Sequence, residues 1–314
     1  MFKFLKYTYL PTIGLFTVVL LLPLLVDSSY YLRIATFVFI YAILVLGLIL
    51  LMGYAGQVSL GHAGFCGLGA YAVAIGPTYY GLHSALSLVL GVLATAIIAY
   101  LIGRPLLRLK GYHLAVATLA FGAIVFIILT NEVAFTGGPD GMPVPPLELF
   151  GITILGTRTW YWIAGGTLIL ASLAVCSLIN SPTGRALRAI HDSEVAADAL
   201  GIDIRAYKVL AFVISAVFAA LAGGYMALFD GHVTPVSSSM MRSIEFLTMA
   251  VVGGLGSIVG SVVGSAFLVL LPQLLSSFQE YEHAILGGLM IVSMMFLRKG
   301  IVPSISSWLL RRFK

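Results

Sequence analysis

Charge is scarce in this sequence. Asp, Glu, Lys and Arg together make up 9% of its 314 residues, against about 25% in an ordinary soluble domain. Hydrophobic residues make up 60%, more than the core of a water-soluble chain of this length could bury. Several uncharged runs reach the roughly 20 residues that a helix needs to cross the hydrocarbon of a bilayer. The composition therefore predicts an all-α, polytopic integral membrane protein.

Cysteine is almost absent. The two cysteines, Cys66 and Cys176, lie in separate apolar segments, and no CxxC pair or Cys/His spacing typical of zinc ligands occurs. The six histidines show neither HxxxH nor HExxH spacing. We therefore expect neither a disulfide framework nor a metal site.

Nucleotide-binding and catalytic motifs are missing as well. The sequence has no Gly-Lys dipeptide, which the phosphate-binding motif GxxxxGK[ST] requires. It also lacks the paired carboxylates or Cys/His dyad that a membrane-embedded enzyme would need. We expect no catalytic residue, no cofactor on this chain and no nucleic-acid partner.

Apolar windows of helical length predict ten membrane spans. The first follows Lys3 and Lys6 like a signal peptide, but no small-residue cleavage site comes after it, so we predict a retained span. The stretch 246–275 is apolar throughout, so it forms either two spans or one span and a re-entrant segment. The predicted spans lie near 8–26, 33–52, 60–76, 84–103, 112–130, 160–179, 207–229, 243–257, 260–276 and 283–297.

The distribution of basic residues predicts an orientation. With the N-terminus in the cytoplasm, 14 of the 17 Lys and Arg residues are cytoplasmic, and Arg33, Arg158 and Arg242 remain outside. Positive residues in short loops favour the cytoplasmic side. We therefore predict that both termini are cytoplasmic and that residues 1–314 form a single transmembrane domain. The cytoplasmic set comprises Lys3, Lys6, Arg104, Arg108, Lys110, Arg185, Arg188, Arg205, Lys208, Arg298, Lys299, Arg311, Arg312 and Lys314.

Glycine gathers in two stretches, "GYAGQVSLGHAGFCGLGAY" (53–71) and "GGLGSIVGSVVG" (253–264). Each glycine costs about 1 kcal/mol against alanine inside a helix, but small residues let helices approach closely in lipid. Close helix packing is the favoured interpretation. The alternative is unwound backbone along a substrate path, which polar groups at membrane depth support. The residues concerned are Gly53, Gly56, Gln57, Ser59, Gly61, His62, Gly64, Gly67, Gly256, Gly260 and Gly264.

The most polar long stretch is "SPTGRALRAIHDSEVAADALGIDIR" (181–205). Ser181 before Pro182 is typical of a helix start. Asp192 or Ser193 can cap a second short helix, and Gly201 is typical of its end. We predict two short amphipathic helices on the cytoplasmic surface between the sixth and seventh spans.

Two acidic residues, Glu194 and Asp198, lie four apart in the second of these helices. They can complement the dipole at the helix N-terminus, which would make them purely structural. The favoured alternative is a docking surface for a partner, because the segment is longer than a connector needs to be and has an apolar face.

Glu245 is the carboxylate that we place within a span, near its outer end. An ionised group at mid-membrane costs about 3 kcal/mol or more and is often functional. Nearer the interface it reaches water, and Arg242 is close by as a partner. Glu245 is therefore either a substrate or gating contact or an interfacial anchor. The proline-rich outer loop 131–159 is either a lip that contacts an external protein or a plain surface loop.

Five segments resemble the signatures of one protein family. The sequence is similar over about residues 45–297 to the permeases of branched-chain amino acid ABC importers, the LivH/LivM family and its LivM type in particular. The resemblance is specific for the family but not for the substrate. The segments are "GYAGQVSLGHAGFCGLGAY", "LKGYHLAVATLAFG", "TGGPDG", "GRALRAIHDSEVAADALGI" and "SIEFLTMAVVGGLGSIVGSVVG".

The resemblance implies a translocation subunit of the cell inner membrane that is not itself an enzyme. Such a subunit works with a second, related permease subunit, two cytoplasmic ATPases that bind the ATP and Mg²⁺, and an extracytoplasmic solute-binding protein. Its cargo would be a branched-chain or related small hydrophobic amino acid, moved by alternating access. The residues that would sit in a cleft of an ATPase are Arg185, Arg188, Glu194, Ala197, Asp198 and Gly201.

Two other transport functions stay open. Permeases for urea and short amides are similar to the same family. An ion-coupled secondary transporter acting alone would usually need carboxylates or histidines at mid-span, and only His62 and Glu245 are candidates, both near span ends. Co-purification with an ATPase would distinguish the two mechanisms.

Overall fold

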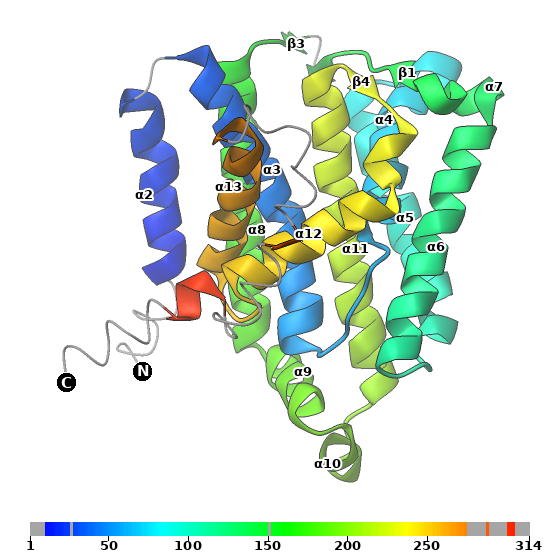
Figure 1. Ribbon diagram of the computed structural model, residues 1–314, viewed down its shortest axis with the longest axis vertical. Helices are drawn as coiled ribbons and strands as arrows, with labels where there is room; N and C mark the ends of the chain where they lie inside the picture. The colour runs from blue at the N-terminus through cyan, green and yellow to red at the C-terminus, as the bar shows by residue number, and fades with distance from the viewer. Residues whose placement is uncertain (1–9, 26–27, 150–151, 275–286, 289–299, 305–314) are drawn as a thin grey trace.

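The computed structural model describes residues 10–25, 28–149, 152–274, 287–288 and 300–304, and these are mostly helical (Figure 1). The predicted helical membrane bundle is the architecture observed. The longer helices are α2 (Leu10–Leu25), α3 (Ser29–Leu48), α4 (His62–Tyr80), α5 (Ser84–Leu106), α6 (Tyr112–Asn131), α8 (Thr157–Asn180), α11 (Ile204–Asp230), α12 (Met240–Gly253) and α13 (Ile258–Leu274).

Helix α3 forms the centre of the bundle. It continues into the π-helix η1 (Ile49–Tyr54). In the most apolar 18 residues of this helical run, 89% of the residues are buried, against 28% in the corresponding stretch of α5. A helix that is apolar on every face is suited to such a position. α3 contacts α8, α11 and α13, whereas α4 packs between α5 and α11. The outer faces of α5 and α6 carry exposed apolar side chains, as expected for a surface that meets lipid.

Within the described part of the chain, five helices are long and apolar enough to cross a membrane: Ser29–Tyr54, Ser84–Leu106, Tyr112–Asn131, Thr157–Asn180 and Ile204–Asp230. Each of the first nine predicted spans coincides with a helix. The last, 283–297, lies outside the described residues apart from 287 and 288.

The stretch 246–275 is divided at its glycines, as the sequence suggested. Helix α12 ends at Gly253, Gly254 takes a positive φ of 112°, and α13 begins at Ile258. The 14 residues of α12 span about 21 Å at 1.5 Å per residue, less than the roughly 30 Å of hydrocarbon. α12 also runs obliquely across the bundle (Figure 1). It does not by itself make a full crossing.

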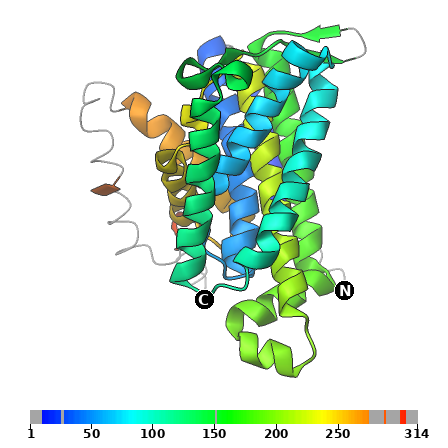
Figure 2. The ribbon, with the colours of Figure 1, turned by 90° about the vertical axis from the view of Figure 1, so that its right-hand side faces the viewer.

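The two ends of the bundle differ in their short elements. At one end lie α7 (Val133–Thr136), η2 (Gly138–Asp140), η3 (Pro235–Ser238) and two small antiparallel pairs: β1 (Met142–Pro143) with β4 (His232–Val233), and β2 (Leu147–Leu149) with β3 (Ile152–Ile154). At the other end α9 (Pro182–Asp192) and α10 (Glu194–Ala199) project beyond the long helices (Figures 1 and 2).

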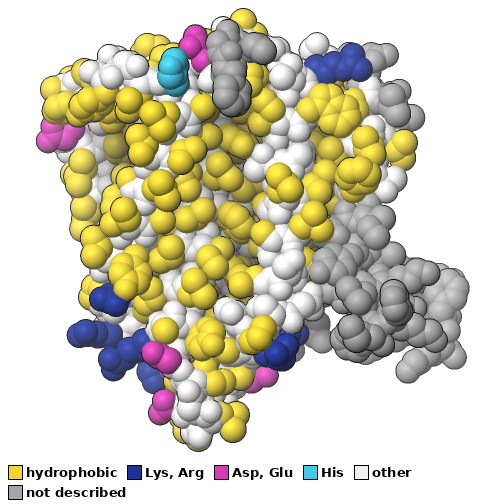
Figure 3. Space-filling model, turned by 180° about the vertical axis from the view of Figure 1, so that it is seen from behind, with side chains coloured by type: hydrophobic (Ala, Val, Ile, Leu, Met, Phe, Trp, Pro, Cys, Tyr) yellow, Lys and Arg dark blue, Asp and Glu magenta, His cyan; other side chains and the backbone are white. Residues whose placement is uncertain are grey.

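Charge also distinguishes the two ends. On the face seen in Figure 3, most of the Lys and Arg side chains gather at the end where α9 and α10 project. This end includes Arg108 and Lys110 after α5 and Arg205 and Lys208 at the start of α11. The broad band between the ends is apolar (Figure 3).

Candidate functional site

The projecting segment 181–205 is built as two capped helices, which confirms the local prediction. Ser181 Oγ accepts a hydrogen bond from the Gly184 N–H at 3.4 Å, and Ser193 Oγ accepts one from the Ala196 N–H at 3.3 Å. Gly201 takes a φ of 78° just after α10. These caps supply partners for N–H groups that a helix start would otherwise leave unpaired. Ser193, rather than Asp192, is the second cap.

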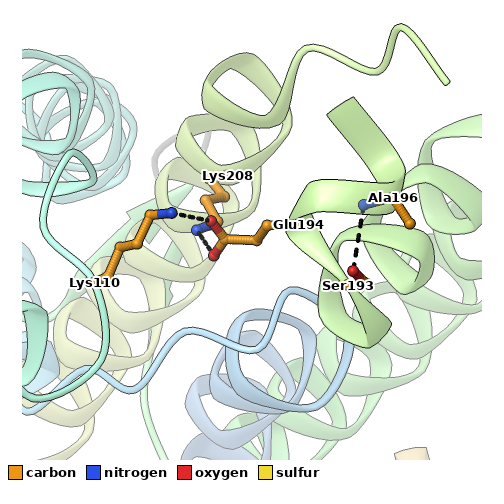
Figure 4. Close-up of polar contacts among 5 residues, drawn as sticks. All are labelled: Lys110, Ser193, Glu194, Ala196 and Lys208. Carbon is orange, nitrogen blue, oxygen red and sulfur yellow. Dashed lines mark hydrogen bonds and ion pairs between the residues drawn. The ribbon is translucent and has the colours of Figure 1, made fainter. Parts of the chain in front are cut away.

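Glu194 anchors α10 to the bundle. Its Oε1 accepts a hydrogen bond from Lys208 Nζ of α11 at 2.5 Å, and its Oε2 lies 3.2 Å from Lys110 Nζ in the α5–α6 loop (Figure 4). The hydrogen bond from Lys208, helped by Lys110, holds the pKa of the Glu194 carboxyl below its ordinary value. Glu194 is thus engaged within its own chain, and no local sequence pattern predicts these two distant partners.

The other predicted coupling residues take three kinds of position. Ala197 is buried against the bundle. Arg185 and Arg188 cover the end of α8: Arg188 Nη2 donates to the Ile179 carbonyl at 2.8 Å, and Arg185 Nη1 to the Asn180 carbonyl at 3.4 Å. Asp198 and Gly201 line a cavity of about 780 Å³ at the basic end. This cavity also includes Arg108, Lys110, Glu194, Arg205 and Lys208.

Two large apolar side chains of this segment face outward. Val195 is 80% exposed and Leu200 is 78% exposed. By contrast, Leu187 and Ile190 of α9 are buried and hold that helix on the bundle. The apolar face predicted for the segment is therefore divided between an anchoring part and an uncovered part.

Residues 55–61 interrupt the helical run between η1 and α4, so unwound backbone and helix packing both occur in the first glycine stretch. Side chains of neighbouring helices satisfy this backbone: Thr118 Oγ1 accepts from the Leu60 N–H at 3.0 Å, and Ser243 Oγ accepts from the Ala63 N–H at 3.1 Å. Irregular backbone at membrane depth needs such protein cover.

The polar residues of this interruption are buried. His62 Nδ1 lies 3.0 Å from Ser59 Oγ, and its Nε2 lies 2.6 Å from Ser215 Oγ of α11. Gln57 is 3% exposed, and neither atom of its amide has a hydrogen-bond partner among the described residues. A buried amide without a partner is costly, so Gln57 stands out from the satisfied groups around it.

The interruption also connects two other parts of the molecule. Gly56, at a φ of 66°, faces His191 at the end of α9. A Cβ placed on Gly56 would lie 3.1 Å from Cδ2 of His191. Tyr54 donates to the Gly256 carbonyl at 3.4 Å, and a Cβ on Gly53 would overlap the Leu255 carbonyl. The segment therefore touches α9 on one side and the α12–α13 turn on the other.

The remaining glycines named from sequence lie at close helix contacts, with one exception. A Cβ on Gly61 would overlap the Thr118 carbonyl, and one on Gly64 would lie 3.1 Å from Gly122 Cα. A Cβ on Gly67 would overlap Ser238 Oγ. Gly260 and Gly264 face the backbone of α12, whereas Gly256 lies in the turn with no atom within 4 Å of an added Cβ.

Arg242 and Glu245, three residues apart in α12, form an ion pair in the half of the bundle away from α9 and α10. Arg242 Nη1 donates to Glu245 Oε2 at 2.7 Å. Nearby, Arg33 of α3 donates to Asp230 Oδ1 at the end of α11 at 3.0 Å. Asp230, Arg242 and Glu245 all line a cavity of about 370 Å³ between α3, α11, α12 and α13.

Among the described residues, no three His, Cys, Asp or Glu side chains are grouped to hold a metal ion. Cys66 and Cys176 are both buried. The candidate functional regions consist of the projecting segment 181–205, the interrupted backbone at 55–61 and the ion pairs around Arg242 and Glu245.

An apolar bundle with membrane-length helices, a charged cavity and a capped basic projection is the architecture of a multi-pass membrane protein. The family model for the permease component of branched-chain amino acid transport systems matches residues 30–294. The chain belongs to this family, as its motifs suggested. No solved structure matches it.

Curated relatives agree with this assignment. The high-affinity branched-chain amino acid transport system permease protein LivM of Escherichia coli (strain K12) is 36% identical over 294 residues, which cover 86% of this chain and 69% of that protein. The LivH permease protein of Salmonella typhimurium is 29% identical over 287 residues, covering 83% and 91%. A probable LivM permease of Methanocaldococcus jannaschii is 24% identical over 235 residues, covering 69% and 68%.

Proposed function

We propose that this chain is the transmembrane subunit of an ATP-driven importer of branched-chain or related small hydrophobic amino acids. It spans the cell inner membrane ten times as one domain, with both termini in the cytoplasm. It binds no cofactor itself, because ATP and Mg²⁺ belong to two ATPase subunits. A second, related permease and an extracytoplasmic solute-binding protein complete the transporter.

The projecting pair of helices α9 and α10 carries the proposal. Its apolar residues Val195 and Leu200 are uncovered at the basic end of the bundle, and basic residues favour the cytoplasmic side for this end. An exposed apolar patch on a capped, ordered helix is suited to a partner's groove. An ATPase subunit is the partner that the family membership suggests.

The contacts of α9 offer a route for coupling. Closure of the ATPases displaces α9, whose His191 presses on the Gly56 turn. The Tyr54–Gly256 hydrogen bond extends this route to the α12–α13 turn. The spans then rotate about their glycine contacts and open the path alternately to the two sides.

The test is reconstitution of the chain with the three kinds of proposed partner: the second permease, the ATPases and the solute-binding protein. ATP-dependent uptake of labelled leucine into proteoliposomes, together with co-purification of the ATPases, is the expected result. Uptake driven by an ion gradient without ATPases would contradict the proposal in favour of a secondary transporter. ATP-dependent uptake of urea but not of leucine would contradict its substrate class.

A further inference from the structure

A charged cavity lies between α3, α11, α12 and α13, in the half of the bundle away from α9 and α10. Its volume is about 370 Å³, at the lower end of the range of roughly 300–1,000 Å³ for small-molecule pockets. Its walls combine two kinds of side chain. Asp230, Arg242 and Glu245 supply charge, and Met226, Met249 and Leu268 supply apolar surface.

The charges at this cavity are two carboxylates and one guanidinium. Arg242 and Glu245 are paired at 2.7 Å, while Asp230 is paired at 3.0 Å with Arg33, whose guanidinium lies against the rings of Phe37 and Phe229. Glu245 is 18% exposed and Arg242 is 38% exposed. Among the described residues, Arg242 makes its one side-chain hydrogen bond with Glu245. A guanidinium has five N–H donors, so Arg242 keeps donors for a second acceptor.

Two of these charges, Asp230 and Arg242, also line a second, smaller cavity of about 140 Å³. Met226 lines both cavities as well, and Cys66 and Gly223 line the smaller one. Asp230 and Arg242 therefore border two neighbouring hollow regions. Charged groups at membrane depth are costly without partners or water. If this ion pair were purely structural, we would expect protein to pack tightly around it and leave no cavity beside it.

We propose that the larger cavity binds a zwitterionic α-amino acid with an apolar side chain. Arg242 receives the carboxylate, since a guanidinium matches a carboxylate in a bidentate geometry. Asp230 and Glu245 receive the ammonium group. Met226, Met249 and Leu268 surround the apolar side chain, and the flexible methionines adapt to its branching. This site rests on the proposed function and adds to it the groups that recognise the cargo.

The site makes a chemical distinction between the two cargo classes that the sequence left open. A zwitterion uses both signs of charge, whereas urea and short amides carry no charge and leave the guanidinium and carboxylates unused. A site built to pair a charge rejects the analogue that lacks it, because its buried groups then stay unpaired.

The test is equilibrium binding of labelled L-leucine to the full chain, co-purified with its partner subunits in nanodiscs. Competitors are 4-methylpentanoate, which lacks the amino group, and 3-methylbutylamine, which lacks the carboxylate. The variants are Arg242→Gln, Arg242→Lys, Glu245→Gln and the double variant Arg242→Gln/Glu245→Gln. Arg158→Gln, an exposed arginine of the same end that does not line the cavity, is the matched control.

We expect Arg242→Gln to weaken leucine binding at least tenfold and Arg242→Lys to restore part of it. Arg242→Gln should also remove the preference for leucine over 3-methylbutylamine, while Glu245→Gln should reduce the preference for leucine over 4-methylpentanoate. The double variant stays weak, whereas a purely structural ion pair would predict recovery when both charges are removed. Arg158→Gln binds as the wild type does.

Two failures are distinguishable. Wild-type complex that takes up no amino acid in proteoliposomes would overturn the proposed function and, with it, this site. Normal wild-type uptake with leucine affinity and analogue preference unchanged in Arg242→Gln and Glu245→Gln would overturn the site alone.

Discussion

Single glycines decide how closely the central helices approach each other. Gly69 of α4 faces the α11 backbone, where an added Cβ would overlap the carbonyl of Ala220, and Gly223 of α11 faces the Cys66 carbonyl in the same way. Backbone atoms cannot rotate aside as a side chain can. The contact between α4 and α11 is therefore made by the two main chains themselves.

Gly69→Ala tests this contact with the smallest possible change. Overpacking of this kind typically costs about 1–3 kcal/mol, so the melting temperature of the purified protein should fall. Gly166→Ala in α8 is the control, because an added Cβ there meets no atom within 4 Å, and alanine is the better helix former. Equal melting temperatures for the two variants would contradict the close approach.

Glu194 makes the attachment of α10 dependent on pH. Because its pKa is lowered in the folded protein, its stabilising effect is complete above the ordinary glutamate pKa of about 4.5. That effect is lost as the pH falls through the lower, folded value. The pair is partly exposed, so the effect is about 1 kcal/mol or less.

Hydrogen exchange of α10 measured from pH 7 to pH 3, after correction for the intrinsic rate, checks this dependence. Protection should decline on acidification in the wild type and be low and nearly constant in Glu194→Gln. Asp198→Asn is the control on the same helix, since Asp198 makes no ion pair within the described part of the chain. The same acid-induced decline in Glu194→Gln would show that another group is responsible.

At the scale of elements, α10 and the residue after it leave Val195 and Leu200 uncovered by their own chain, and the proposed function assigns these two residues to an ATPase partner. We expect Val195→Asp/Leu200→Asp to abolish co-purification of the ATPases, since charges would enter an apolar groove. The fold should persist because both residues are largely exposed. Leu155→Asp, exposed at the opposite end, should leave the ATPases bound. Retention of the ATPases by the double variant would exclude α10 as their docking element.

Local signals could be predicted from the sequence, and distant contacts could not. Ser181, Ser193 and Gly201 act on backbone within a few residues, so their caps follow from spacing alone. The Arg242–Glu245 pair follows in the same way from a separation of three. The partners of Glu194 come from α11 and the α5–α6 loop, and only the folded packing brings them together.

The interrupted helices were harder to foresee for a different reason. Hydropathy separates the predicted spans 33–52 and 60–76 and shows that 246–275 is apolar, but it does not record the direction of the chain. The π-helix η1, the irregular backbone at 55–61 and the oblique course of α12 depend on partners such as Thr118 and Ser243. The glycines mark where such breaks fit, and the neighbouring helices decide whether they form.

At the scale of the whole molecule, the two ends differ in structure. The basic end carries α9 and α10 with their uncovered apolar residues, the other end carries the short strands, and the charged cavity lies between α3, α11, α12 and α13. The interruption at 55–61 touches both α9 and the α12–α13 turn. The proposed function requires that the projecting helices lie on the cytoplasmic side.

Labelling of single introduced cysteines tests this requirement most directly. The native Cys66 and Cys176 are buried and give little background, while Leu200 and Leu155 are 78% and 69% exposed at opposite ends. In intact spheroplasts a membrane-impermeant maleimide should label Leu155→Cys, and it should label Leu200→Cys only after permeabilisation. Labelling of Leu200→Cys in intact spheroplasts would place α10 outside and contradict the account.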